Sequence, residues 1–141
     1  MKKIYSLGLL FSIVLLPGCS KDFLKNYEDR IIGSWQITDV NRIGLGGNTN
    51  SLAFTSGKFT FYENGSLDYT DASNISYHGN WEIVKKVHDD QTVRSLQITA
   101  IDFTNQRVLA EYYDDMNFVG TNHFKANIIS GFHTYVTHFR R

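Results

Sequence analysis

The sequence contains a single cysteine, Cys19, and a single proline, Pro17. Because Cys19 has no second cysteine to pair with, disulfide bonds within the chain are excluded. The absence of proline after residue 17 suits long strands, which need every backbone N–H for hydrogen bonding. A concentrated basic stretch is also missing, so the composition argues against a nucleic-acid partner.

Long hydrophobic runs are scarce as well. The longest mostly apolar run, residues 4–16, is shorter than the roughly 20 residues that a membrane-spanning helix needs. It follows Lys2 and Lys3 and ends before Gly18, the order of a basic region, an apolar region and a cleavage site in a secretory signal. The sequence therefore predicts a signal peptide over residues 1–18. With Lys2 and Lys3 removed, the chain carries two more acidic than basic side chains.

The residues Leu16-Pro17-Gly18-Cys19 resemble the lipobox of bacterial lipoproteins. The resemblance implies that the thiol of Cys19 carries lipid and that a peptidase cuts before it. Lipid chains on one residue hold a soluble domain at a bilayer surface without spanning it. The alternative is an ordinary leader cysteine in a precursor that is cut elsewhere.

The residues after Cys19 indicate where in the cell the protein is anchored. By resemblance to lipoprotein sorting patterns, Ser20 favours the outer membrane, and Asp22 is a partial match to the surface-export signals of Bacteroidetes lipoproteins. The protein is thus expected at the cell envelope, anchored to the outer membrane and facing the periplasm or the cell surface. Residues 19–32 form the lipidated N-terminus and a tether or short helix, which we expect to pack against one end of the following domain.

The remaining residues, 33–141, leave room for one domain, and their pattern is all-β. Ten phenylalanines and eight tyrosines in the chain supply an apolar core. Asn64-Gly65 gives a strong hairpin signal because both residues tolerate positive φ. Eight β-prone runs cover residues 33–40, 58–62, 66–70, 75–84, 94–101, 107–113, 117–127 and 132–140. Short sequential connections predict an eight-stranded antiparallel up-and-down barrel.

Gly33-Ser34-Trp35 at the start of the first run is similar to the Gly-x-Trp signature of the lipocalin (calycin) group, especially the compact lipocalin-like domains of Bacteroidetes lipoproteins. The resemblance implies a barrel closed at one end around Trp35. It also implies that Arg140 packs across the indole, although Arg141 could take that place. A guanidinium stacked on an indole is worth about 0.5 to 2 kcal/mol.

Alternation along the strands predicts which side chains point into the barrel. These candidates for a ligand-binding lumen are Phe59, Phe61, Leu67, Tyr69, Tyr77 and Trp81. An eight-stranded barrel is wide enough either to be filled by its own side chains or to hold one small ligand. A filled lumen would instead favour a role in protein interaction.

Chemistry-bearing motifs are few. The five histidines, at positions 78, 88, 123, 133 and 138, lack a metal-ligand spacing, so no metal or cofactor is expected. The acidic pairs Asp89-Asp90 and Asp114-Asp115 fall in predicted turns. No catalytic residue can be nominated. The leading hypothesis is an envelope lipoprotein that binds or carries a small apolar molecule. The alternative is a structural or protein-interaction lipoprotein with a solid barrel, and an enzyme comes third.

Overall fold

The computed structural model describes residues 25–88 and 90–141. The predicted signal peptide, Cys19, Ser20 and Asp22 lie outside the described residues. A short helix, α1 (Tyr27–Ile31), precedes the strands, and a 3-10 turn, η2 (Thr49–Ser51), lies between the first two strands. The strands are β1 (Gly33–Gly44), β2 (Lys58–Phe61), β3 (Ser66–Thr70), β4 (Ser76–His88), β5 (Gln91–Asp102), β6 (Arg107–Tyr113), β7 (Asp115–Phe118), β8 (His123–Ser130) and β9 (His133–Arg140).

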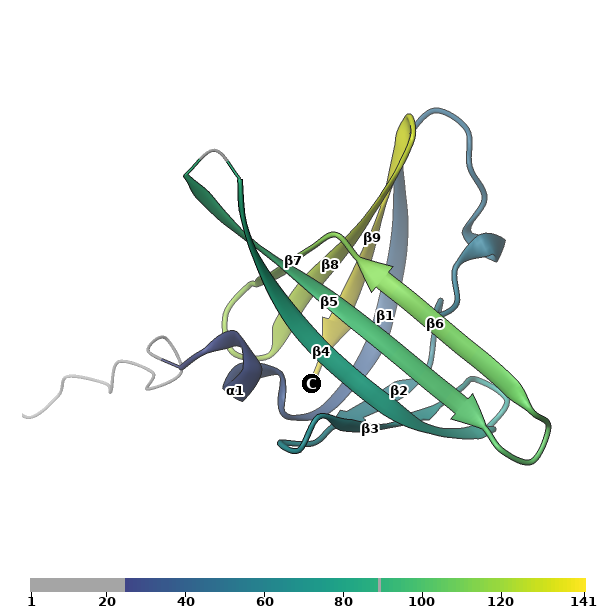
Figure 1. Cartoon of the computed structure of the whole chain (residues 1–141). Helices are drawn as coiled ribbons and strands as arrows, with labels where there is room; N and C mark the ends of the chain where they lie inside the picture. The colour runs from purple at the N-terminus through teal and green to yellow at the C-terminus, as the bar shows by residue number, and fades with distance from the viewer. Residues whose placement is uncertain (1–24, 89) are drawn as a thin grey trace, which may run out of the picture.

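The prediction of an all-β, antiparallel domain is confirmed. All nine strands join one sheet in the order β6-β5-β4-β3-β2-β1-β9-β8-β7, and every neighbouring pair in it is antiparallel. Figure 1 shows the sheet curling so that its strands surround a common interior, with α1 at one end. The pairing of β1 with β9 brings the first and last strands side by side.

The predicted count of eight strands is wrong, because the run predicted over residues 117–127 contains a turn. Gly120 lies there at φ 78, a conformation that glycine adopts without steric cost. The backbone N–H of Val119 donates to the carbonyl of His123 at 2.8 Å, which reverses the chain. One predicted strand therefore becomes two, β7 and β8.

The prediction of a closed barrel is also corrected, because the hydrogen-bonded sheet has two edges, β6 and β7. Only Asp114 separates these strands in the chain, and its backbone N–H donates to the carbonyl of Asn127 on β8 at 2.7 Å. Its carboxylate accepts the N–H of Ile129, and its carbonyl accepts the hydroxyl of Ser95 on β5. The chain thus changes partner at Asp114, from β5 to β8, and the ladder is interrupted there.

Inward-facing side chains fill the interior of the sheet. Most are aromatic or aliphatic, and burying each large one stabilises the fold by about 1.5 to 3 kcal/mol relative to exposure. The largest that are completely buried are Trp35, Phe54, Phe59, Phe61, Leu67, Tyr77, Leu96, Ile98, Tyr113, Phe124 and Phe139. Two non-strand segments cover the ends of this core: α1 at one end, and the connection between β1 and β2, which carries Phe54, at the other.

Candidate functional site

The end of the sheet covered by α1, which we call the α1 end, is built around Trp35. Its indole is 1% exposed, and its ring N–H donates to the carbonyl of Ile31 at 2.6 Å. The indole meets Phe124 edge to face, with ring centroids 4.8 Å apart, and lies against Phe118 at 6.0 Å. Tyr27 of α1 packs edge to face on Phe118. The helix therefore closes this end by covering aromatic rings.

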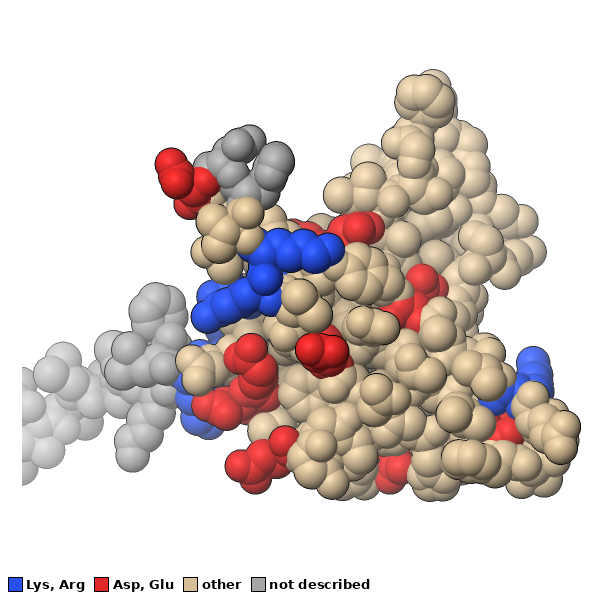
Figure 2. All heavy atoms as spheres, in the orientation of Figure 1, with Lys and Arg blue, Asp and Glu red and all other residues tan. Residues whose placement is uncertain are grey.

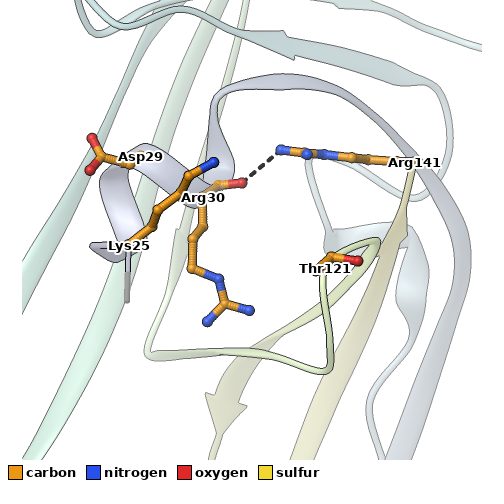
Figure 3. Close-up of a pocket in the computed structure, with 5 residues that line it drawn as sticks. All are labelled: Lys25, Asp29, Arg30, Thr121 and Arg141. Carbon is orange, nitrogen blue, oxygen red and sulfur yellow. Dashed lines mark hydrogen bonds between the residues drawn. The ribbon is translucent and has the colours of Figure 1, made fainter. Parts of the chain in front are cut away.

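An arginine lies across the indole of Trp35, but it is Arg141 and not Arg140. The Arg141 guanidinium is 4.3 Å from the ring centroid. Its Nη2 donates to the carbonyl of Ile32 and to that of Arg30, at 2.7 Å each, and Figure 3 shows the bond to Arg30. Strand alternation explains the correction, since inward Phe139 leaves Arg140 on the outer face. Arg141 also satisfies carbonyls at the end of α1, which have no partner within the helix.

Gly33, the other residue of the predicted motif, directly follows α1. Its φ of 112° is strained for any side chain, and a Cβ there would lie 3.8 Å from Nη2 of Arg141. The structure thus brings Gly33, Trp35 and Arg141 together at the α1 end. Arg140 instead pairs in register with Gln36 and His123 on the outer face.

The six predicted lumen residues all face the interior, and their rings contact one another. Phe59 stacks on Tyr69 at 4.5 Å and on Phe61 at 5.7 Å. Phe61 meets Trp81 at 5.7 Å, and Tyr69 meets Tyr77 at 5.4 Å. All six, Leu67 included, are 9% exposed or less. These side chains act as filling for one another.

Sequence reasoning missed Phe54, which completes that filling from the irregular segment before β2. Its ring is 1% exposed and meets Phe59 and Tyr69 edge to face, at 5.2 and 4.9 Å. The segment is held by polar contacts on both sides: the N–H of Ala53 donates to Glu111 at 2.8 Å, and the hydroxyl of Tyr69 donates to the carbonyl of Ser56 at 2.8 Å. No periodic signal marks an aromatic residue in such a segment.

Two clefts remain near this segment. One has a volume of about 220 Å³ and is lined by Tyr69, Tyr77, Leu109, Asp71 and Arg107 among others. Burial raises the pKa of Tyr69 to about 12. The other, of about 330 Å³, is lined by Gln97, Ile98, Ala110, Glu111 and Tyr112. Burial also raises the pKa of Glu111.

Two polar clusters lie on the outer face. Asp68 accepts hydrogen bonds from Tyr62 at 2.7 Å and pairs with His78 at 2.6 Å; these contacts, the Tyr62 bond first, lower the pKa of Asp68. His123 and His138 approach within 3.2 Å between ring nitrogens. Burial, and then the charge of Arg140, lower the pKa of His123. Residues 25–88 and 90–141 contain no group of three or more His, Cys, Asp or Glu residues that could hold a metal ion.

The end opposite α1 exposes apolar side chains on the outer face of β1, β9 and β8. Ile43, Thr134 and Ile129 form one cross-strand row there. Leu45 and Phe132 continue it beyond the strand ends, where the N–H of Leu45 donates to the carbonyl of Phe132. We call Ile43, Leu45, Ile129 and Phe132 the distal patch; they are 62%, 83%, 64% and 91% exposed. In Figure 2 the projection formed by this end shows neither acidic nor basic side chains.

Comparison with known proteins adds no relative: the chain matches no family model, no curated protein and no solved structure. Within the described part of the chain, no helix is long and apolar enough to cross a membrane.

Proposed function

We propose that the protein is a lipoprotein held at the outer membrane by lipid on Cys19, and that it docks a second envelope protein through the distal patch. The observation that carries this proposal is the distal patch itself, four exposed apolar side chains around one strand row at the end opposite the tether. Contiguous exposed apolar surface on a monomer commonly marks an interaction site.

The filled interior favours docking over enclosed carriage. Ligand pockets for drug-sized molecules have volumes of about 300 to 1,000 Å³ and enclose most of the ligand. Here the six predicted lumen residues belong to one buried cluster, and Phe54 packs on two of them, Phe59 and Tyr69. A carrier of an apolar molecule would have to displace these rings. A solid core presents a surface feature rigidly, as an interaction module requires.

The position of the tether favours a protein over the bilayer as the partner. Six peptide bonds join Cys19 to Lys25 and span at most about 20 Å. β1 runs for 12 residues away from the α1 end, or about 40 Å at 3.3 Å per residue. With the α1 end toward the bilayer, the distal patch is held out where another protein can reach it.

A lipocalin-like relationship is part of the same proposal. It is supported by Gly33 and Trp35 at the start of β1 and by the arginine stacked across the indole at the closed end. The anchor has its own test. Replacing Cys19 with alanine should abolish labelling by a fatty-acid analogue, and persistent labelling would refute the lipid assignment.

Docking is tested by photo-crosslinking in intact cells that express the full chain. A photoreactive aromatic residue at position 132 should give one discrete protein adduct, which is lost when Leu45 and Ile43 are changed to serine. The matched control places the same group at Val119, which is 52% exposed at the α1 end. The proposal fails if position 132 yields no protein adduct, only lipid, only a second copy of the chain, or the same adduct as position 119.

The cleft of about 220 Å³ favours a second function, binding of a small molecule with an aromatic or apolar part and an anionic group. Tyr69, Tyr77 and Leu109 supply the apolar contacts, and Arg107 supplies the cation, with the carboxylate of Asp71 in the same lining. A fluorescence screen of small aromatic acids tests this candidate. Binding that Arg107→Gln weakens and Arg42→Gln does not would support it; absence of binding would remove it.

A further inference from the structure

Three arginines, one of them in α1, lie at the α1 end, and each guanidinium lies on an aromatic ring. Arg30 is 4.1 Å from the ring centroid of Phe118, Arg94 is 4.0 Å from that of Tyr27, and Arg141 lies on Trp35 as described above. The rings fix where the guanidiniums sit, so little side-chain entropy is lost when they bind a ligand. We call Arg30, Arg94 and Arg141 the arginine face.

Within residues 25–88 and 90–141, the hydrogen bonds that orient Arg30 and Arg141 go to backbone carbonyls. Arg30 donates to the carbonyl of Gly120 at 2.7 Å, and Arg141 donates to two further backbone carbonyls. Both guanidiniums approach a small pocket of about 20 Å³, as Figure 3 shows, and the carboxylate of Asp29 points away from them. Neutral partners therefore hold charges that remain available to an anion.

More cations gather around the arginine face. Lys85 lies opposite Arg94 in the β4–β5 pairing, and Lys86 is next to it. Figure 2 shows most of the visible blue side chains on this side of the molecule, with red side chains lying among them. Elsewhere on the molecule, Arg42 is bonded to the carbonyls of Gly46 and Gly47. Arg107 shares the lining of a cleft with Asp71.

We propose that the arginine face binds the phosphate groups of anionic lipids, so that the α1 end lies against the bilayer from which the chain is tethered. A guanidinium forms paired hydrogen bonds with phosphate oxygens, and basic residues near a membrane surface strengthen attachment by lipid chains. The orientation rests on the proposed anchor at Cys19, but the affinity for anionic lipid does not need it.

The test uses the mature chain, residues 19–141, with Cys19→Ser so that no lipid is attached. It should sediment with vesicles in which one phosphatidylcholine in three is replaced by phosphatidylglycerol, but not with phosphatidylcholine alone. Binding should fall as the salt concentration rises. The triple variant R30Q/R94Q/R141Q should bind the anionic vesicles about 100-fold more weakly, from roughly one kcal/mol per basic residue.

A charge-matched control removes three cations that lie outside the arginine face, as R42Q/K58Q/R107Q, and should bind within about twofold of the parent chain. Because glutamine at the arginine face could loosen the fold, the variant R30K/R94K/R141K keeps the charge and should retain most of the binding. Three results would overturn the proposal. One is an equal loss of vesicle binding in both glutamine variants, and another is equal sedimentation of the parent chain with phosphatidylcholine alone. The third is a loss of vesicle binding in the lysine variant despite an intact fold. Failure here leaves the fatty-acid labelling at Cys19 unaffected, so the two proposals fail separately.

Discussion

The two ends of the sheet both carry large apolar side chains, but only one end covers them. At the α1 end, a helix and an arginine cover Trp35 and Phe118. At the distal end, Phe132 and Leu45 lie bare on the outer face, although the segment carrying Phe54 seals the interior beneath. A structure that closes its core at both ends has no folding need for the distal patch, which is why we assign that patch to binding.

The difference between the two ends is tested most directly by replacing one large side chain at each end and comparing the losses of stability. Trp35→Ala should lower the free energy of unfolding by about 3 to 5 kcal/mol, since the indole is buried and its N–H bonds to Ile31. Phe132→Ala should change it by less than about 0.5 kcal/mol. Urea unfolding measures both variants. Similar losses would mean that the distal patch is part of the core.

A smaller effect is expected at Asp114, where the chain passes from β5 to β8. Asp114→Ala removes the acceptor of the Ile129 N–H and should destabilise the protein by about 0.5 to 1.5 kcal/mol. The neighbouring Asp115→Ala is the control, because its carboxylate accepts a hydrogen bond from the side chain of Asn117 and, among the contacts of the described chain, none from a backbone N–H. Equal losses would show that Asp114 has no special part in joining the two edges of the sheet.

Because Arg141, and not Arg140, lies on Trp35, replacing Arg141 should lower the free energy of unfolding by about 1 kcal/mol. Arg141→Met should lose the stacking on Trp35 and the bonds to α1, whereas Arg140→Met should be close to neutral. Thermal unfolding at low salt compares the two. A larger loss for Arg140 would restore the arrangement predicted from the sequence.

A pH-dependent effect concerns Tyr69, beneath the segment that seals the distal end. Its pKa is raised to about 12 in the folded protein, whereas tyrosine in an unfolded chain ionises near 10. The unfolded state therefore loses its proton first, and stability should fall as pH rises from about 10 to about 12. Tyr69→Phe should flatten this dependence, measured by urea unfolding across that range. An unchanged slope would assign the titration to other tyrosines.

Much of the interior could be predicted from the sequence, because strand alternation depends only on neighbours along the chain. Phe59, Phe61, Tyr69 and Tyr77 were found in this way. Phe54 was not, since contacts with distant Glu111 and Tyr69 hold its segment in place.

Three further features escaped prediction for related reasons. Arg140 was preferred over Arg141 because the side that each takes depends on where β9 ends, and the seventh predicted strand became two because Gly120 forms a turn inside an apolar run. The distal patch was missed because an outward Ile43 or Ile129 looks, in sequence, like any strand residue. Exposed apolar residues differ from core residues in burial, and burial depends on which segments cover the sheet.

The orientation of the anchored protein tests the account most directly. Single cysteines at Val119 and Phe132 can carry a fluorophore in the lipidated protein reconstituted in anionic vesicles. A quencher attached to lipid headgroups should quench the label at position 119 strongly and leave the label at position 132 nearly unaffected. Stronger quenching at position 132 than at position 119 would place the distal patch on the bilayer and contradict the account.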